Sequence, residues 1–235
     1  NHGVNLKEGD VVVDVGANIG VLGIRLSKKF EKIQIHSFEP IPNIFEVLKK
    51  NSKLSNNPFF KVYENGLGEK NENKEFTYFP NSPALSTAEP EVWEKEKKSL
   101  INAVKGSIQN APKKFWWAKF TPSFIAPLFA KYLTSNRKKI ICKIITISDF
   151  IKSEKINHID FLKIDCEGLE WEVLKGIQKN DWIKIKSCVI EVHDINQRLK
   201  KVIKLLKSHQ FNVVVEKEMS LKNTKLTNVF AVKNN

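Results

Sequence analysis

VVVDVGANIG, residues 11–20, is a run of apolar residues that ends in Asp14 and in a turn carrying Gly16 and Gly20. One helical segment later, a second apolar run, IQIHSFEP, ends at Glu39. A buried strand, a glycine-bearing turn, a helix and a second strand that ends in an acidic residue form the corner at which an α/β sheet binds a nucleotide-like ligand. We therefore expect the adenosine end of a cofactor at this corner.

The glycine spacing narrows the choice of cofactor. A dinucleotide site carries three glycines spaced GxGxxG, whereas this turn reads D-x-G-x-N-x-G, with Gly16, Asn18 and Gly20 after Asp14. A carboxylate on the strand end suits a cofactor with a cationic amino-acid tail, and Glu39 can accept hydrogen bonds from both ribose hydroxyls. S-adenosylmethionine fits this pattern better than NAD. A tight turn without any ligand is the alternative, and the position of Glu39 argues against it.

Length and composition predict one α/β domain spanning residues 1–235, because 235 residues with 41% hydrophobic content can bury a substantial core but not two. The first residues show no secretory signal pattern, so we expect a cytoplasmic protein. Cys142, Cys166 and Cys188 are expected to be reduced core thiols. The net charge of +13 is compatible with an anionic partner, but lysine is spread over nearly every segment.

Apolar runs alternate with helical patterns along most of the chain, which predicts a mostly parallel sheet. The last two strands are joined without a helix, so one strand should be antiparallel. The expected strands are 11–15, 34–38, 59–63, 142–147, 160–165, 187–193, 211–216 and 226–232, and the expected helices are 21–29, 44–52, 169–179 and 195–208.

Residues 81–139 interrupt this alternation. Between Pro80 and Ile140, eleven Lys and Arg stand against four Glu, and the aromatic-rich stretch 115–133 is too broken by Lys and Pro to span a bilayer. Long insertions in compact domains usually carry function. We expect a helical lid over the substrate, with Ser86, Trp116 and Trp117 in contact with it. The alternatives are a solvated elaboration, an oligomer contact, or contact of Trp116 and Trp117 with a membrane surface.

A second charged cluster lies in FLKIDCEG, where a strand ends in Lys163, Asp165 and Glu167. In open α/β sheets ligands bind beyond the carboxyl ends of the strands, so these residues should share the crevice of Gly16. Capping of the next helix by carboxylates would explain Glu167 but not Lys163. On the following strand, Glu191 and His193 share one face near the same rim.

Six motifs in register carry a family resemblance: VVVDVGANIG, FEP at 38–40, ENGLGE at 64–69, ITISDFI, IDFLKIDCEG and VIEVHD. From about Gly9 onward the chain resembles the FkbM family of S-adenosylmethionine-dependent methyltransferases, and in particular the O-methyltransferase domains of polyketide and nonribosomal peptide synthases. The resemblance implies a Rossmann-like class I methyltransferase with a mostly parallel seven-stranded sheet, one antiparallel strand and helices on both faces. Gly168 is a departure, because many members carry a bulkier residue after the glutamate.

The resemblance also implies roles for individual residues. Glu39 would hold the ribose, Asn65 would lie beside the adenine, and His193 is the first candidate for the base that deprotonates an acceptor hydroxyl. A divalent cation on Asp165, Glu167 and Glu191 is the alternative to a protein base; we expect no metal. The full expected sets are Asp14, Gly16, Asn18, Gly20, Glu39, Pro40, Asn65, Gly66 and Leu67 for the cofactor, His193, Asp165, Glu167 and Lys163 for catalysis, and Ser86, Trp116, Trp117 and Glu191 for the substrate.

The implied reaction is O-methylation of a polyketide or related natural-product intermediate. The acceptor would be a small acyl substrate tethered to an acyl carrier protein or held by neighbouring synthase domains, whose acidic surface would complement the basic insertion. Neither nucleic acid nor a membrane span is expected. The rival hypotheses are RNA ribose 2'-O-methylation, which lacks a recognisable RNA-binding motif here, and a noncatalytic cofactor-binding scaffold within a larger assembly.

Overall fold

The computed structural model describes residues 2–90, 97–109, 111–122, 124–217 and 226–233. Its centre is a seven-stranded sheet in the order β3-β2-β1-β7-β8-β10-β9. Only β10 runs antiparallel to its neighbours, as the sequence predicts. The strands of this sheet are β1 (Val11–Val15), β2 (Gln34–Phe38), β3 (Phe60–Tyr63), β7 (Phe161–Ile164), β8 (Ser187–His193), β9 (Phe211–Glu216) and β10 (Leu226–Lys233).

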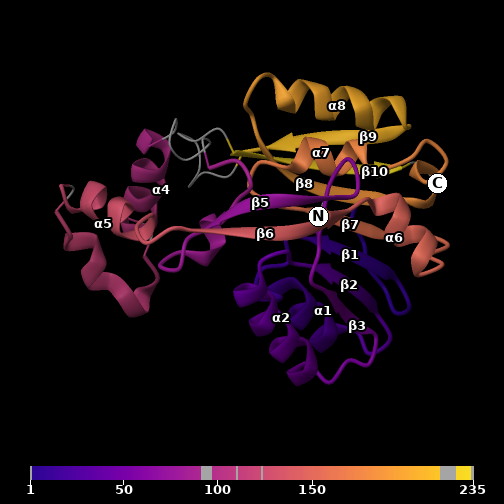
Figure 1. Cartoon of the computed structure of the whole chain (residues 1–235), viewed down its shortest axis with the longest axis horizontal. Coiled ribbons are helices and arrows are strands. Elements are labelled where there is room, and N and C mark those ends of the chain that lie inside the picture. The colour runs from indigo at the N-terminus through magenta and orange to yellow at the C-terminus, as the bar shows by residue number, and fades with distance from the viewer. Residues whose placement is uncertain (1, 91–96, 110, 123, 218–225, 234–235) are drawn as a thin grey trace.

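Helices cover both faces of the sheet, because side chains alternate along each buried strand. Val12 packs with α1 and α2 on one face, whereas Val11, Val13 and Val15 pack with α6, α7 and α8 on the other (Figure 1). This arrangement confirms the predicted Rossmann-like architecture. The helices are α1 (Val21–Lys29), α2 (Pro42–Leu54), α6 (Ile147–Ser153), α7 (Glu170–Lys175) and α8 (Arg198–Ser208).

A second, three-stranded sheet lies over the carboxyl-end corner of the first. It has the order β4-β6-β5, with β4 (Gly66–Leu67), β5 (Glu72–Tyr78) and β6 (Lys138–Ile145). The strand expected at 142–147 is therefore β6, which belongs to this sheet and begins earlier. Phe76 and Ile144 of the second sheet pack with Ile41 and Ile44, so the sheet is held against the segment that follows β2.

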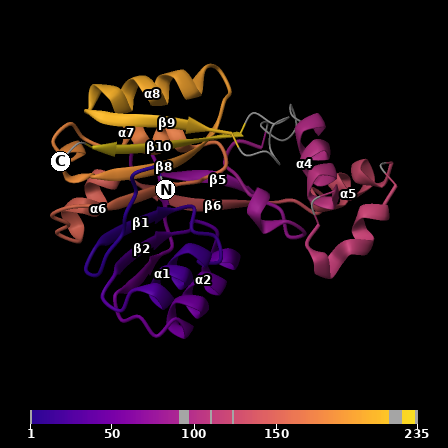
Figure 2. The ribbon, with the colours of Figure 1, turned by 180° about the vertical axis from the view of Figure 1, so that it is seen from behind.

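The described residues between β5 and β6 are 79–90, 97–109, 111–122 and 124–137. They contain η1 (Pro83–Leu85), α4 (Lys97–Gln109), η2 (Lys113–Phe120) and α5 (Ile125–Leu133). Both the front and the back views place α4 and α5 beyond the far ends of β5 and β6, at the opposite end of the molecule from α6 (Figures 1 and 2). The helical insertion expected at 81–139 thus forms an outlying unit, which we call the α4–α5 unit (residues 97–133). Trp93, which the sequence places on the first helix of this insertion, lies outside the described residues.

The α4–α5 unit has a small core of its own. Leu100 and Val104 of α4 pack against Ala126 and Ala130 of α5, with Ile108 alongside. These apolar side chains of α4 therefore form the contact between the two helices. Within the described ranges, no helix has the length and apolar character needed to cross a membrane.

Candidate active site

A cleft opens where β1, β2 and β7 end. The second sheet and the segment 83–86 form the facing wall. The lining residues are Val15, Gly16, Asn18, Phe38, Glu39, Pro40, Ile41, Ile44, Gly66, Leu67, Phe76, Pro83, Ala84, Ser86, Asp165, Cys166, Glu167 and Leu169.

Gly16 allows the two strand-end corners to touch. Its φ is 75°, and a Cβ added there would lie 1.8 Å from the carbonyl oxygen of Asp165. The amides of Gly16 and Ala17 donate to the carbonyl of Phe38 at 3.1 and 2.9 Å, which ties the turn to the end of β2 as well. A side chain at position 16 would thus separate the VGANIG and KIDCEG corners, because it would meet backbone rather than a movable side chain.

The Glu39 carboxylate is held rigidly at the cleft. Its Oε2 accepts from the amide of Asn18 at 3.1 Å and its Oε1 accepts from the amide of Ile41 at 3.0 Å. Burial raises the pKa of Glu39 to about 7, against the lowering effect of these two backbone donors. Each carboxylate oxygen can still accept a second hydrogen bond. The group is therefore pre-positioned to receive ligand hydroxyls, and it carries a desolvation cost that such donors would offset.

Lys163 lies between two carboxylates. Its Nζ is 3.4 Å from Oδ1 of Asp14, which is 1% exposed, and 3.0 Å from Oδ2 of Asp165. Burial lowers the pKa of Lys163, but the two carboxylates outweigh it and the net pKa is raised. Burial raises the pKa of Asp14, and the positive charge of Lys163 offsets only part of this rise. Lys163 is thus a permanent ammonium that joins the ends of β1 and β7, and it is a poor proton acceptor.

A chain of alternating charges runs inward from Glu167. His193 Nε2 lies 3.3 Å from Glu167 Oε2, and His193 Nδ1 lies 3.2 Å from Oε1 of Glu170. Glu170 is completely buried and its other oxygen is 3.3 Å from Arg198, which in turn lies 3.2 Å from Glu89. Buried charges persist in this way only when each has an opposite partner. The chain links β8, α7 and α8 to the segment before α4.

The charges determine which group can take a proton. Burial lowers the pKa of His193, but Glu167 and Glu170 outweigh burial and raise it to about 10. Burial raises the pKa of Glu167, and burial with the charges of Asp165 and Glu167 raises that of Glu191 to about 7. His193 is therefore an imidazolium at neutral pH in this structure. Glu167 lines the cleft and His193 lies behind it.

The backbone at Glu167 is in an unusual conformation. Its φ is 51°, in the left-handed region that non-glycine residues seldom occupy, and that of Gly168 is 110°. The Thr87 hydroxyl donates to the carbonyl of Glu167, and the amide of Gly168 donates to Glu170 Oε1 at 2.7 Å. Gly168, the departure noted in the sequence, is thus required by the turn that presents Glu167 to the cleft.

The structure brings most of the expected residues together. Gly16, Asn18, Glu39, Pro40, Gly66, Leu67, Ser86, Asp165 and Glu167 line the cleft. Lys163 and His193 contact Asp165 and Glu167, which line it, Asp14 contacts Lys163, and Gly20 is the N-cap of α1. Asn65 and Glu191 are not among the lining residues. Their roles and that of Ser86 stay predictions.

Trp116 and Trp117 differ from the other expected residues. They are 62% and 60% exposed and do not line the cleft, so their contact with substrate also stays a prediction. Sequence reasoning missed Thr87, Glu170 and Arg198, which position Glu167 and His193. Glu170 begins α7, where a carboxylate usually indicates favourable interaction with the helix N-terminus, and no sequence signal pointed to Thr87 or Arg198.

A second cavity, between α4, α5 and the end of β5, lacks such chemistry. Its described lining includes Phe79, Leu100, Ala130, Lys131 and Arg137, but neither a carboxylate nor a histidine. In the described part of the chain, no three His, Cys, Asp or Glu side chains are grouped as metal ligands. All three cysteines are free, and Cys142 and Cys188 are buried as expected, whereas Cys166 lines the cleft.

Comparison with known proteins agrees with this geometry. Residues 14–213 match the model of the methyltransferase FkbM domain. The chain belongs to the FkbM methyltransferase family. The match begins at Asp14 and ends on β9, so it includes both strand-end corners of the cleft.

Relatives of this family member include two proteins named as methyltransferases and one segment of a larger synthetase. The chain is 29% identical over 230 residues to the 31-O-demethyl-FK506 methyltransferase FkbM of Streptomyces tacrolimicus, covering 98% of this chain and 83% of that one. It is 28% identical to the methyltransferase sdnD of Sordaria araneosa, with coverages of 89% and 76%. It is 25% identical to the AMB antimetabolite synthetase AmbE of Pseudomonas aeruginosa, covering 98% of this chain but 11% of the synthetase.

Among solved structures, the chain is similar to the methyltransferase FkbM from Methylobacillus flagellatus KT. The TM-score is 0.54 at 14% identity, and the alignment covers 97% of this chain and 45% of that chain. This likeness supports the fold assignment.

Proposed function

We propose that this FkbM family member is an S-adenosylmethionine-dependent O-methyltransferase that acts on a hydroxyl of a polyketide or related natural-product intermediate. The observation that carries the proposal is the single cleft at the ends of β1, β2 and β7. Glu39 stands on one side of it, and Asp165 and Glu167 stand on the other. A ribose-binding carboxylate and proton-accepting carboxylates therefore share one site.

The residues present fit the cofactor. Gly16 keeps the floor of the cleft free of side-chain atoms, and the buried Glu39 carboxylate has unused acceptor capacity for the two ribose hydroxyls. Gly66 and Leu67 supply a small, apolar wall on which the adenine would rest, and Asp14 and Asp165 supply negative charge for the amino-acid tail. When bound, S-adenosylmethionine supplies a methyl group on a positively charged sulfur.

The protein has to hold the acceptor oxygen in line and remove its proton. Glu167 is the group in position to accept that proton, because its carboxylate lines the cleft and burial raises its pKa. His193, as an imidazolium 3.3 Å away, fixes the orientation of this carboxylate. The alternative, in which His193 is itself the base, requires its ring to lose a proton first.

The proposed class of acceptor is supported by the names of two relatives and by the net positive charge of the chain. The Streptomyces relative is named for a methylation at an oxygen of FK506, and the AmbE match lies within a synthetase. An acyl substrate delivered by an acyl carrier protein or by a neighbouring synthase domain would meet a chain with a net charge of +13, and opposite charge speeds such encounters. A cytoplasmic location is part of the same proposal.

The experiment is a binding and transfer assay with labelled S-adenosylmethionine. Calorimetry should show binding to the wild type, and Glu39→Gln should bind about 10–100-fold more weakly, because one ribose acceptor is lost. Glu8→Gln, which also removes a carboxylate that accepts two backbone amides but lies at the surface, is the matched control. Equal affinity in wild type and Glu39→Gln would overturn the ribose assignment.

In the transfer assay, the protein is incubated with carrier-bound hydroxyacyl thioesters in one set of reactions and with a generic RNA in a parallel set. Label in the thioester and none in the RNA supports the proposal, and label in RNA alone would establish ribose methylation instead. Cofactor binding with no transfer to any hydroxyl acceptor would favour the scaffold hypothesis. Loss of transfer with a chelator, restored by magnesium, would move proton removal to a metal on Asp165, Glu167 and Glu191.

A further inference from the structure

Helix α5 has its small residues inside and its large apolar residues outside. Ala126 and Ala130 are buried against α4, whereas Leu128, Phe129 and Tyr132 are 65%, 47% and 59% exposed. A surface helix of a globular protein normally buries its large apolar residues and exposes its polar ones. Among the described residues of the unit, these three side chains therefore remain exposed to solvent.

The segment before α5 also exposes its large apolar side chains. Trp116, Trp117, Phe120 and Phe124 are 62%, 60%, 76% and 71% exposed, and the rings of Trp116 and Phe120 are in contact, 5.8 Å apart. At roughly 200 Å² for each large side chain, the exposed area of the seven large apolar residues of the unit sums to about 900 Å². The aromatic face, as we call it, consists of Trp116, Trp117, Phe120, Phe124, Leu128, Phe129 and Tyr132.

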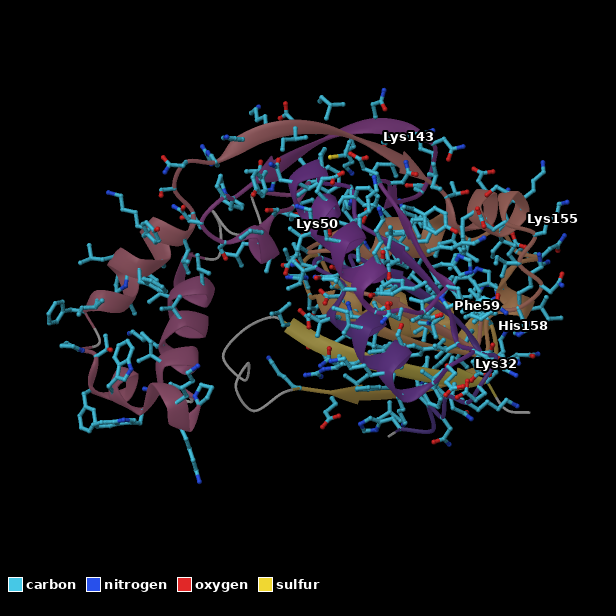
Figure 3. The ribbon with its side chains drawn as sticks, turned by 90° about the horizontal axis from the view of Figure 1, so that it is seen from below. Lys32, Lys50, Phe59, Lys143, Lys155 and His158 are labelled. Atoms are coloured by element: carbon cyan, nitrogen blue, oxygen red, sulfur yellow. The ribbon has the colours of Figure 1, made fainter. Side chains whose placement is uncertain are left out.

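The charge around the aromatic face has one sign. From Lys97 to Lys139 the sequence contains ten Lys and Arg and no Asp or Glu, so this stretch accounts for ten of the thirteen net positive charges of the chain. In the view from below, Lys143 of β6 lies over the body and apart from the unit (Figure 3), so the charge at the aromatic face comes from the insertion itself. A partner of this surface must therefore be both apolar and anionic.

We propose that the α4–α5 unit docks the protein onto an anionic lipid surface, with the aromatic face in the headgroup region and the lysines against lipid phosphates. Trp and Phe interleaved with Lys are typical of segments that lie in a membrane interface. A second copy of the chain would place two strongly cationic units face to face, which opposes association. An acidic protein with an apolar surface is the other occupant that the test below distinguishes.

The docking unit is coupled to the cleft. Asn81 Nδ2 donates to the carbonyl of Tyr132 on α5 and to the hydroxyl of Ser135, both at 3.0 Å. Two residues further on, Pro83, Ala84 and Ser86 form one wall of the cleft. Docking would therefore place the substrate side of the cleft near the lipid surface, where an amphiphilic acceptor is concentrated. This last step rests on the proposed function, whereas docking itself does not.

Vesicle co-sedimentation tests the docking. The full chain should sediment with vesicles of phosphatidylglycerol and phosphatidylcholine, with tryptophan fluorescence shifted to the blue, and should stay in solution with phosphatidylcholine alone. The combined variant Phe120→Ser, Phe124→Ser, Leu128→Ser should bind about 10-fold or more weakly, since each loses apolar area that the interface would bury. The control replaces Leu54 and Ile183, which are 77% and 81% exposed on the body, with Ser.

Charge is tested separately with Lys113→Gln, Lys114→Gln, Lys131→Gln, against Lys28→Gln, Lys200→Gln, Lys207→Gln on the body. Only the first set should reduce binding strongly, and added salt should weaken the wild type. Circular dichroism and cofactor affinity establish that each variant is folded. Absence of vesicle binding at low salt, or equal loss in the body controls, would overturn docking.

Two further outcomes would assign the aromatic face to another partner. If the Ser variants abolish a concentration-dependent dimer while the wild type ignores vesicles, the face is an interface between copies. If they abolish binding to an acyl carrier protein instead, it is a protein-docking surface. Cofactor binding is measured in the same samples, so a failure of docking is distinguishable from a failure of the proposed function.

Discussion

The cleft and the α4–α5 unit differ in which side chains they bury and which they expose. Around the cleft, charged groups are buried and paired, as in the chain from Glu167 through His193 to Glu170. In the α4–α5 unit, large apolar groups such as Phe120 and Phe124 are exposed and the sequence between Lys97 and Lys139 has no acidic residue. Burying charged groups costs stability in the isolated chain, whereas an exposed apolar surface leaves stability nearly unchanged and marks a site of interaction. The comparison teaches that each region is built for something outside the chain, a small charged ligand in one case and an extended surface in the other.

The largest expected effect concerns the contact between the two corners of the cleft. Gly16→Ala should abolish cofactor binding, and it should lower stability by several kcal/mol, because the new Cβ would meet the Asp165 carbonyl at 1.8 Å. Gly9→Ala is the control, since Gly9 has a similar φ of 82° but nothing within 4 Å of a Cβ. Thermal unfolding and calorimetry of both variants separate the clash from the backbone strain. Similar losses in the two variants would show that the corners are not in contact.

The next effect is on catalysis. Glu167→Gln should lower kcat by roughly 10²–10⁴-fold with little change in cofactor affinity, because the group that accepts the proton is removed. The wild-type pH profile discriminates between the two candidate bases. With Glu167 as the base, kcat should rise through the raised pKa of this carboxylate and then reach a plateau before pH 10. With His193 as the base, whose pKa is raised to about 10, kcat should keep rising toward pH 10. A profile of the second kind would return His193 to the role that the sequence predicts.

His193 should also govern the stability of the ligand-free protein. Its folded-state pKa of about 10 lies above the ordinary value of 6.5, so its contribution is complete below about pH 6.5 and is lost as pH rises through 10. His193→Gln should cost roughly 3–5 kcal/mol near pH 7, as expected when one partner of a buried ion pair is removed. It should also flatten the decline in stability between pH 7 and 10. Denaturant titrations across this range measure both effects, and an unchanged slope in the variant would contradict the assigned charge.

The smallest effect is expected in the α4–α5 unit. Phe120→Ser should change stability by less than about 0.5 kcal/mol, because the side chain is 76% exposed. Phe38→Ala in the body should cost about 3–5 kcal/mol, since Phe38 is fully buried. The two variants are compared by chemical denaturation in the absence of lipid. A large loss in Phe120→Ser would mean that the aromatic face is part of a folded core, and the contrast between the two regions would disappear.

The sequence predicted the body of the fold well. The strand ends at Val15 and Phe38 and the boundaries of α1 agree with the structure, because apolar periodicity and glycine are local signals. β5 was missed, since its first four residues, Glu72 to Glu75, are polar, and β6 could not be assigned to a second sheet because pairing is a non-local property. Helix α7 is shorter than expected; it ends at Lys175, before Gly176, whose Cβ would lie 2.0 Å from the Gly68 carbonyl.

The sequence predicted which residues meet at the cleft better than it predicted their charge states. Gly16, Glu39, Asp165 and Glu167 meet at one cleft, because parallel strands place their carboxyl ends at one edge. The positive charge of His193 could not be read from its type or position. It depends on Glu170, which is a helix residue that folding buries completely beside the ring.

A crystal structure of the protein with S-adenosylhomocysteine tests the central claim most directly. The account predicts both ribose hydroxyls on the Glu39 carboxylate, the adenine beside Gly66 and Leu67, and the sulfur facing the side of the cleft formed by Asp165 and Glu167. A ligand bound elsewhere on the molecule, or in this cleft with its ribose away from Glu39, would contradict it.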